Sequence, residues 1–298
     1  VTINNGSGNN TINAGDGTVD GLRGDLIVNG QGGTDTLNIN DNSDTGDNIG
    51  ELTNNQITGL GIGNSKSITY SNLEHLNLNL GTSDDTLDVK STSAGTETHV
   101  STGAGTNTVN VASTAPASDG NVHGVQGHLQ ITGQGSSDVV NVYDKDNNAN
   151  SGTLTDSTLT GLGMGTSGIT YGGLENLNIE LGSRVDTFLV ESTASSTLTD
   201  IQTGGGGDTV NVEAISGETI VTTGGGANVR VGSTTGNVQP SVTPTDSVLN
   251  TIGAALTLSA SAVPPSTLRL YDTGNSVGVG DGRLTSTNVT GFGMASDG

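Results

Sequence analysis

The sequence lacks cysteine and tryptophan and is poor in aromatic and basic residues. Its 298 residues include two Phe, four Tyr and eight Lys or Arg against 30 Asp or Glu, and the formal net charge is −22. The absence of cysteine excludes a disulfide framework. The shortage of basic residues argues against nucleic acid or anionic membranes as partners, because both are bound through clustered Lys and Arg. No apolar run approaches the roughly 20 residues of a membrane helix, so we expect no membrane insertion.

Large apolar side chains are also scarce. Only 30% of the residues are hydrophobic, whereas 49 residues are glycine. One thick core would not offset the conformational entropy of so long a chain. Two states tolerate this composition, namely a disordered chain and a repeat protein in which each coil buries a few small β-branched residues against its neighbours. The periodic pattern described next favours the repeat protein.

The sequence repeats itself over about 100 residues. The segment ITYSNLEHLNLNLG at 68–81 returns as ITYGGLENLNIELG at 169–182. A second segment, GELTNNQITGLGIG at 50–63, returns at 152–165 and 282–295. Such self-similarity is the signature of repeat architectures. The predicted organisation is the end of a preceding unit at 1–22, repeat unit 1 at 23–127, repeat unit 2 at 128–233, an irregular linker or insert at 234–266 and the truncated start of repeat unit 3 at 267–298.

A shorter pattern recurs inside each unit. An apolar residue and a Gly-rich stretch are followed by Asp or Asn, and then by two apolar residues that alternate with polar ones. The two apolar residues share one face of a strand, because side chains alternate along it. The pattern predicts an all-β, elongated parallel β-solenoid (β-helix or β-roll), with an additional coil at the TGLGIG and TGLGMG turns. The predicted inward pairs are Leu37/Ile39, Leu87/Val89, Val109/Val111, Val140/Val142, Phe188/Val190 and Val210/Val212.

The segment TGGGGDTVN at 203–211 resembles the calcium-binding nonapeptide of the RTX, or haemolysin-type, family, and the long unit looks like the tandem modules of very large bacterial surface proteins. The resemblance implies an extracellular or cell-surface protein with calcium bound between adjacent coils. In that family the turn Asp and Gly carbonyls hold the ion, which maps here onto Asp208 with Gly204 and Gly206. The equivalent turns carry Asp35, Asp85, Asp138 and Asp186.

These acidic turns have two interpretations. Calcium takes six to eight oxygen ligands, so carboxylates beside glycine carbonyls suit it. Alternatively, Asp and Asn cap their own turns through backbone hydrogen bonds. A second candidate calcium loop is Asp144-x-Asp146-x-Asn148, which has the ligand spacing of an EF-hand start but lacks its later Gly and Glu. The alternative there is a solvated loop.

We therefore expect an extracellular structural repeat module, such as a fibre, surface layer or adhesin stalk, that is stabilised by calcium and is not an enzyme. The expected partners are calcium ions and further coils, supplied end to end by another copy or by continuation of a longer chain. A flat outward face of Thr and Asn leaves ice or glycan binding open as an alternative. A polysaccharide-degrading β-helix is a further alternative, although Glu74 and Glu175 have no evident catalytic partner. The four histidines show no transition-metal spacing in the sequence.

Overall fold

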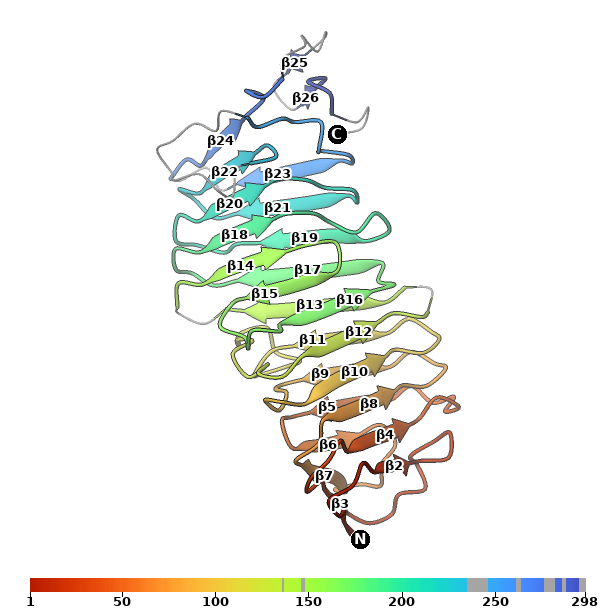
Figure 1. The fold of residues 1–298 in the computed structure, drawn as a ribbon. Helices are drawn as coiled ribbons and strands as arrows, with labels where there is room; N and C mark the ends of the chain where they lie inside the picture. Colours follow the sequence, from red (N-terminus) through yellow and green to blue (C-terminus); the bar gives the residue numbers. More distant parts are fainter. Residues whose placement is uncertain are drawn as a thin grey trace. The chain divides into compact units, whose positions relative to one another are not determined.

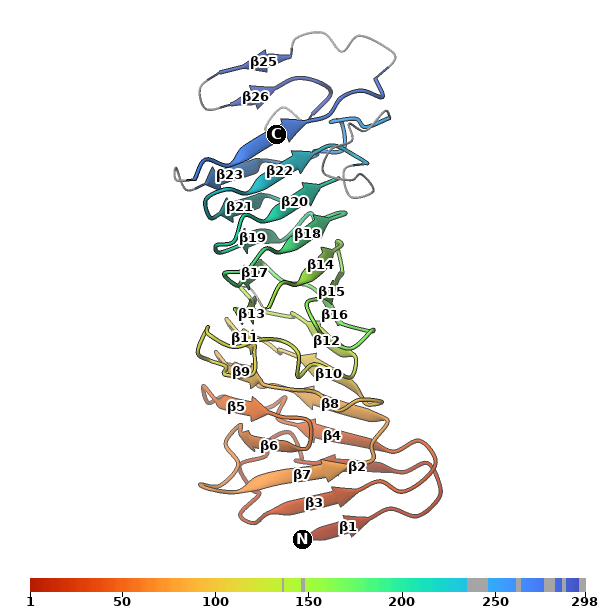
Figure 2. The ribbon, with the colours of Figure 1, turned by 90° about the vertical axis from the view of Figure 1, so that its left-hand side faces the viewer.

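The computed structural model describes residues 1–135, 137–145, 148–234, 246–260, 264–275, 282–285 and 288–294. Within these ranges the regular elements are β-strands, and no helix is present. No helix in the described part of the chain is therefore long and apolar enough to cross a membrane. The strands form long sheets in which parallel pairing dominates, as Figures 1 and 2 show. This all-β architecture is compatible with a β-solenoid.

The chain divides into two compact units, of which unit 1 comprises Val1–Asp144 and Thr160–Leu177. In unit 1, sheet A has the strand order β1-β3-β7-β6-β5-β9-β11-β13, and sheet B has the order β2-β4-β8-β10-β12-β16. The strands are β1 (Thr2–Asn4), β2 (Thr11–Ala14), β3 (Leu26–Asn29), β4 (Thr36–Asn40), β5 (Ile49–Leu52), β6 (Gln56–Gly59), β7 (Ser67–Ser71), β8 (His75–Asn79), β9 (Thr86–Val89), β10 (Glu97–Ser101), β11 (Thr108–Val111), β12 (Leu129–Thr132), β13 (Val139–Asp144) and β16 (Ile169–Gly172).

Unit 2 comprises Lys145–Leu159 and Asn178–Gly298. Its part of sheet A has the order β17-β19-β21-β23, its part of sheet B has the order β14-β18-β20-β22-β24, and β25 pairs with β26. The boundaries between the units fall at the end of β13 and within β15 and β17. The strands are β14 (Ser151–Leu154), β15 (Thr158–Gly161), β17 (Asn176–Leu181), β18 (Thr187–Val190), β19 (Leu198–Gln202), β20 (Thr209–Val212), β21 (Thr219–Thr223), β22 (Asn228–Val231), β23 (Leu256–Ala260), β24 (Thr267–Leu270), β25 (Arg283–Leu284) and β26 (Val289–Thr290).

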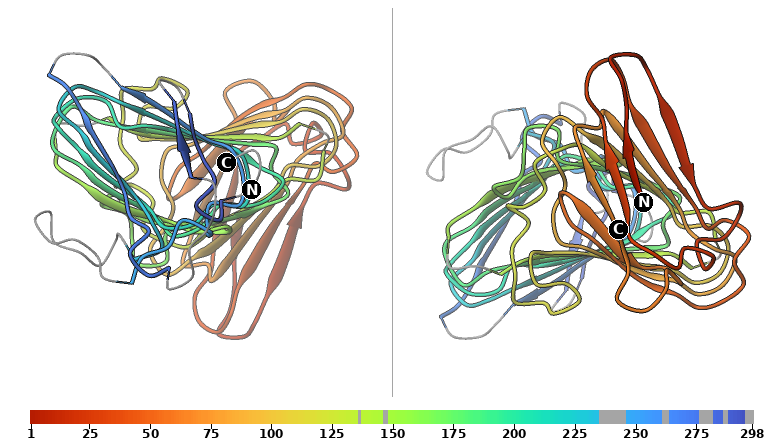
Figure 3. Two further views of the ribbon diagram at one scale, coloured as in Figure 1. Left: turned by 90° about the horizontal axis from the view of Figure 1, so that it is seen from above. Right: turned by 90° about the horizontal axis from the view of Figure 1, so that it is seen from below.

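The core of each unit lies between its two sheets. Successive coils pair in register, so that Leu37 of β4 lies beside Leu76 of β8, and Val109 of β11 lies beside Val140 of β13. Seen end-on in Figure 3, the coils within a unit follow similar paths. All the inward pairs expected from the sequence are buried, with at most 1% of any side chain exposed. The period-two pattern therefore identified the core correctly.

The TGLGIG turn does not add a coil, contrary to the sequence-based prediction. Instead, β5 and β6 form an antiparallel hairpin, and β6 also pairs antiparallel with β7. The turn of this hairpin lies at residues 53–56, and the positive φ of Gly59, Leu60 and Gly61, at 77°, 51° and 73°, follows it and turns the chain from β6 toward β7. Leu60 accepts this strained conformation while its side chain is fully buried. A period-two pattern does not distinguish a parallel coil from a hairpin, since both alternate in the same way.

Part of the predicted linker at 234–266 is regular, which the sequence did not indicate. Within its described residues, β23 pairs in parallel with β21, with Val221 beside Leu258. The preceding turn, in which the Ile252 N–H donates to the Leu249 carbonyl at 3.0 Å, matches the Val19–Leu22 turn before β3. The prolines and the departure from the repeat led to the prediction of a linker, although β23 pairs in parallel like the strands before it.

Candidate functional site

The predicted acidic turn residues occupy one structural position, immediately before a strand. Asp35 precedes β4, Asp85 precedes β9, and Asp138 precedes β13. Asp186 and Asp208 stand at the same position in unit 2, before β18 and β20. All five side chains are buried, with at most 2% exposed. We call the residue directly before such a strand a corner residue. Four further corner residues are Asn10, Glu74, Asn107 and Glu175. Because the strands pair in register, the corner residues of neighbouring coils in one sheet lie side by side.

In unit 1 the corner residues form a hydrogen-bonded ladder. The Asp85 N–H donates to Asn107 Oδ1 at 2.8 Å. The Asn107 N–H and Nδ2 both donate to Asp138 Oδ1, at 3.2 and 3.0 Å. The Asp138 N–H in turn donates to Glu175 Oε2 at 2.6 Å. Each side chain therefore accepts the backbone N–H of the corner residue one coil earlier.

The same ladder runs along sheet B of unit 1 and in unit 2. Asn10 donates through its N–H and Nδ2 to Asp35 Oδ1, at 3.1 and 2.9 Å, and the Asp35 N–H donates to Glu74 Oε2 at 2.7 Å. In unit 2 the Asp186 N–H donates to Asp208 Oδ1 at 3.0 Å. Glu74 and Glu175 are thus members of the ladder, a role that their recurrence in the sequence did not reveal.

The second carboxylate oxygen of several corner residues is held by its own turn. Asp85 Oδ2 accepts the Gly81 N–H at 2.9 Å, and Asp208 Oδ2 accepts the Thr203 hydroxyl at 2.6 Å. Asp138 Oδ2 accepts the N–H groups of Gln134 and Gly135 at 2.9 and 3.0 Å. Such bonds compensate the burial of a carboxylate, which would otherwise be costly.

The environment moves the pKa values of the corner carboxyls in different directions. The Asn10 side chain, which donates to the Asp35 carboxylate, lowers the pKa of Asp35. Burial raises the pKa of Asp85 and of Asp208, and the hydrogen bonds that each accepts oppose that effect. Desolvation therefore outweighs hydrogen bonding at Asp85 and Asp208, and the reverse holds at Asp35.

Gly204 and Gly206 serve the close approach of coils. Both have positive φ, at 72° and 114°. A Cβ on Gly204 would lie 1.9 Å from the Gly182 carbonyl oxygen, and one on Gly206 would lie 2.1 Å from that of Arg184. Any side chain at these positions would push neighbouring coils apart.

Both carboxylate oxygens of Asp85, Asp138 and Asp208 accept N–H or O–H groups, and calcium at these turns stays a prediction. Calcium needs six to eight oxygens, whereas these oxygens accept N–H and O–H groups. In the ladder of unit 1, Asn107 separates Asp85 from Asp138, whereas Asp138 and Glu175 are adjacent. Within the described ranges, no three His, Cys, Asp or Glu side chains are grouped so that they could hold a metal. The geometry favours the interpretation of these side chains as turn caps.

The second candidate loop begins with another set of caps. Asp144 Oδ1 accepts the Val122 N–H at 3.4 Å, as Asp41 Oδ1 accepts the Val19 N–H at 2.9 Å and Asp272 Oδ1 accepts the Leu249 N–H at 3.3 Å. Each accepted N–H belongs to the turn of the preceding coil. Asp146 lies outside the described residues, so its role as a calcium ligand stays a prediction.

Asp41 differs from the other caps in its second oxygen. The side chain is fully buried, and Oδ2 has no hydrogen-bond partner in the described structure. Burial, reinforced by the nearby carboxylates of Asp44, Asp20 and Asp85, raises the pKa of Asp41 to about 6. The Asp41 carboxyl therefore takes up a proton at a higher pH than an ordinary aspartate does.

The coil arrangement also gathers three histidines that look isolated in the sequence. His75, His99 and His128 lie on or beside the neighbouring strands β8, β10 and β12. His75 Nδ1 lies 3.2 Å from Glu97 Oε2, and the rings of His99 and His128 have centroids 6.5 Å apart. Spacing along the chain could not reveal this cluster, because its members come from three coils.

The outward face of sheet B carries a rank of asparagines. Asn38 Nδ2 donates to Asn13 Oδ1 at 2.7 Å, and Asn77 Nδ2 donates to Asn38 Oδ1 at 2.8 Å. The neighbouring threonine rank is short, because Thr36 lies beside His75 in the next coil. The ordered feature of this face is therefore the amide ladder.

Comparisons of the chain with protein-family models, with curated proteins and with solved structures found no match.

Proposed function

We propose that this chain is an extracellular structural repeat module, a β-solenoid that acts as a spacer, fibre or adhesin stalk and has no catalytic role. The observation that carries the proposal is the ladder of hydrogen bonds between corner residues, in which the buried Asn107 and Asp138 are followed by the half-buried Glu175. A side chain that accepts the N–H of the previous coil sets the register of the next one. Repetition of this contact supports a function in which length is built by adding coils.

The acidic corners have a mechanical role in this proposal. Each coil contributes its strand hydrogen bonds and one corner bond, and the stability of such an array is approximately the sum over neighbouring coils. At Asp85, Asp138 and Asp208 both oxygens already have N–H or O–H donors, so the ladder at these corners forms without calcium, which stays a proposed ligand of the Gly/Asp turns. The extracellular location rests on the resemblance to surface-protein modules, and the expected partners are further coils, from another copy or from a longer chain.

The asparagine rank supports a second candidate function, the binding of glycan or ice by the outward face of sheet B. Amides fixed by their neighbours present a regular row of donors and acceptors. Glycan-array binding and thermal hysteresis test this candidate. An Asn38→Asp variant, which loses the Nδ2 donor to Asn13, would abolish a signal that depends on the rank.

Length is the property that tests the proposed function. Residues 50–151 span one long repeat, and a variant in which they are duplicated in tandem adds nine strand positions, or about 4.5 coils. At about 4.8 Å per coil, small-angle X-ray scattering should show a particle longer by about 22 Å with an unchanged cross-section. An increase in cross-section without an increase in length would refute the proposal.

A further inference from the structure

A notch interrupts the outer surface of unit 1 beside sheet B, where one coil is shorter than the coil before it. Thr92 lies beside Val125, and Thr98 of β10 lies beside Leu129 of β12. Six steps along the chain lead from Thr92 to Thr98, whereas only four lead from Val125 to Leu129. The middle coil therefore crosses the same distance with two residues fewer.

Turns of the neighbouring coils form the walls of this notch. On one side the Thr96 N–H donates to the Ser93 carbonyl at 3.1 Å, and on the other the Gly168 N–H donates to the Gly165 carbonyl at 3.0 Å. Gly127 of the short connection is buried, and a Cβ there would lie 2.1 Å from the Ser93 carbonyl oxygen. The space between the turns is an open cavity of about 440 Å³, a size typical of ligand sites.

The lining of the notch is polar. It supplies a carboxylate, an imidazole, an amide and hydroxyl groups, which together donate and accept hydrogen bonds. No Phe, Tyr or Trp and no large aliphatic side chain is among the lining residues in the described part of unit 1. A ligand rich in hydroxyl groups, such as a sugar, has the complementary chemistry. The lining side chains are Thr96, Glu97, Gln126, His128, Thr166 and Ser167.

Two of these side chains are oriented by their neighbours. The Glu97 side chain is 53% exposed, and its Oε2 lies 3.2 Å from His75 Nδ1. In the next coil, His128 Nε2 lies 3.0 Å from Thr170 Oγ1, and the His128 ring stands edge-on to that of His99 at a centroid distance of 6.5 Å. A site whose groups are already held in place loses less entropy when a ligand binds.

The second long repeat has the same short connection with different side chains around it. In unit 2, a Cβ on Gly217 would lie 2.1 Å from a carbonyl oxygen of the preceding turn, as it would in the first copy. Leu198 and Glu218 stand where the first copy has Glu97 and His128. The coil geometry therefore forms whichever side chains occupy these two outward positions.

The charge of the site selects among sugars. Acidic sugars are repelled, because Glu97 contributes a carboxylate to the lining and the chain carries a formal net charge of −22. A sugar that bears an amine is attracted, since a protonated amine and a carboxylate form a charge-assisted hydrogen bond. Gln126, Thr166 and Ser167 are exposed, so their polar groups are accessible to the ring hydroxyls.

We propose that this notch is a binding site for an amino sugar with a free amine, such as a glucosamine residue of a glycan. The amine donates to the Glu97 carboxylate, and the ring hydroxyls bond to Gln126, Thr166 and Ser167. The inference goes beyond the structural-module function and does not depend on the asparagine rank. In a stalk or fibre, such a site attaches the rod to a glycan that contains amino sugars.

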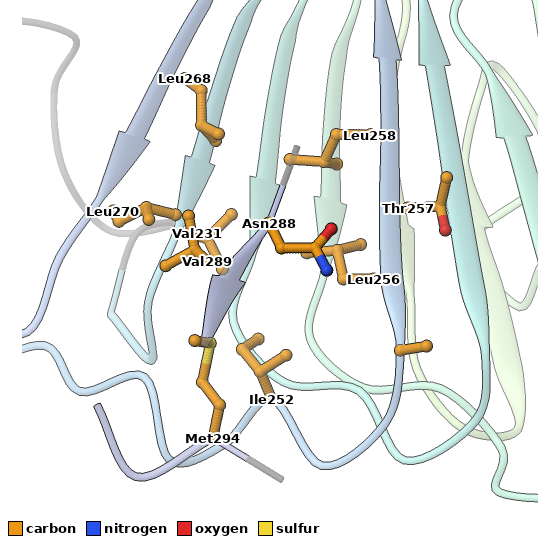
Figure 4. Close-up of a pocket in the computed structure, with 11 residues that line it drawn as sticks. Val231, Ile252, Leu256, Thr257, Leu258, Leu268, Leu270, Asn288, Val289 and Met294 are labelled. Atoms are coloured by element: carbon orange, nitrogen blue, oxygen red, sulfur yellow. The ribbon is translucent and has the colours of Figure 1, made fainter. Parts of the chain in front are cut away.

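A cavity in unit 2 has the opposite chemistry. Its volume is about 320 Å³, and Figure 4 shows the apolar side chains Leu256, Leu258, Val289 and Met294 around it. None of its lining residues is charged, so a sugar amine finds no counter-charge there. Sugar binding is therefore expected at the notch of unit 1.

Isothermal titration calorimetry of the intact chain with a β-1,4-linked glucosamine trisaccharide tests the proposal. The measurement is made at about pH 6, below the usual pKa of an amino group, so that the amines are protonated. We expect saturable binding of one trisaccharide per chain. The N-acetylated trisaccharide, which lacks the charged amines, should bind at least about tenfold more weakly. Equal binding of the two sugars would overturn the inference.

Variants of the lining locate the site. Glu97→Leu introduces the residue type that unit 2 carries at this position, and Glu97→Gln removes the charge but keeps the size of the side chain. Both should weaken binding at least about tenfold, because a charge-assisted hydrogen bond is lost. Glu191→Leu is the matched control, since it removes an equal charge at an exposed position of unit 2, and it should leave binding unchanged. Circular dichroism checks that each variant folds.

General attraction of a cationic sugar to an acidic chain is the competing explanation. It predicts equal losses of affinity in Glu97→Gln and Glu191→Leu, and that result, or the absence of saturable binding, would also overturn the inference. The length measurement on the duplicated variant does not depend on sugar binding. Failure of binding with normal lengthening therefore rejects only this inference, whereas failure of lengthening rejects the repeat-module function.

Discussion

At the scale of single residues, the corner carboxylates contribute to the choice of one register between neighbouring coils. Asp138 accepts hydrogen bonds from the Asn107 backbone and side chain, and from two N–H groups of its own turn. An apolar interior with few large side chains tolerates many packings. A buried polar group tolerates few, because every unpaired donor costs free energy. The ladder therefore selects one register among many.

Replacing Asp138 should show how much the ladder contributes to the free energy of unfolding. Asp138→Ala leaves several buried N–H groups without an acceptor, and we expect the free energy of unfolding to fall by about 2–4 kcal/mol in urea denaturation. Asp138→Asn keeps one acceptor oxygen and should cost less, since Asn107 serves in the same position. Asp16→Ala, at an exposed position, is the control and should change little. Equal stability of the Ala and control variants would contradict this role.

Asp41 should make stability depend on pH. Its pKa in the folded chain is about 6, above the ordinary value of 3.8, so the folded state binds this proton more tightly than the unfolded state. The resulting stabilisation is complete below pH 3.8 and is lost as the pH rises through 6. Asp41→Asn, a neutral mimic that keeps the acceptor for Val19, should raise the unfolding free energy at pH 8 by at most about 3 kcal/mol.

The pH dependence of that difference is the informative measurement. The advantage of Asp41→Asn over the natural protein should vanish as the pH falls toward 4, whereas Asp16→Asn should show no comparable trend. Thermal unfolding at several pH values provides both curves. A variant that is less stable at pH 8 would show that the carboxylate is favourably paired.

At the scale of elements, the hairpin β5–β6 interrupts the parallel pairing of sheet A in unit 1. Its first strand contains Gly50, opposite Gly59 across the hairpin, and a Cβ on Gly50 would lie 2.6 Å from Leu60 Cδ2. Leu60 is fully buried with φ of 51°, so it has little freedom to move away. The glycine therefore accommodates a leucine that the positive-φ turn places against the strand.

Gly50→Ala should destabilise the hairpin through this contact. Overpacking of this kind costs about 1–3 kcal/mol, and hydrogen exchange should rise in β5 and β6 before the rest of unit 1. Gly24→Ala is the matched control, because no atom lies within 4 Å of a Cβ at that position. Similar exchange in the two variants would mean that Leu60 relocates at little cost.

At the scale of the whole molecule, charge is the dominant property. A formal net charge of −22 makes the folded chain repel itself. Screening by salt reduces that repulsion, since the Debye length falls from about 10 Å at 0.1 M to about 3 Å at 1 M. The free energy of unfolding should therefore increase with ionic strength, whichever cation is used.

Calcium and sodium at matched ionic strength distinguish screening from site binding. We expect the unfolding temperature to rise by a few degrees with either salt, and a chelator to have no further effect, because the corner oxygens already accept hydrogen bonds. Differential scanning calorimetry in NaCl, CaCl2 and CaCl2 with excess chelator is the measurement. A calcium-specific rise in the unfolding temperature that the chelator reverses would show that calcium binds at the corner residues.

The sequence by itself determined the all-β class, the inward residues and the position of each corner, because alternation and recurrence are local properties of the chain. Val109 and Val111 could be assigned to the core from spacing alone. Only the tertiary structure decided which oxygen meets which N–H, since the partners of Asp138 and Glu175 lie on different coils. It also decided that the TGLGIG turn joins two antiparallel strands and that the rings of His99 and His128 have centroids 6.5 Å apart. Contacts between coils depend on register and on positive-φ turns, and neither is encoded in the hydrophobic pattern.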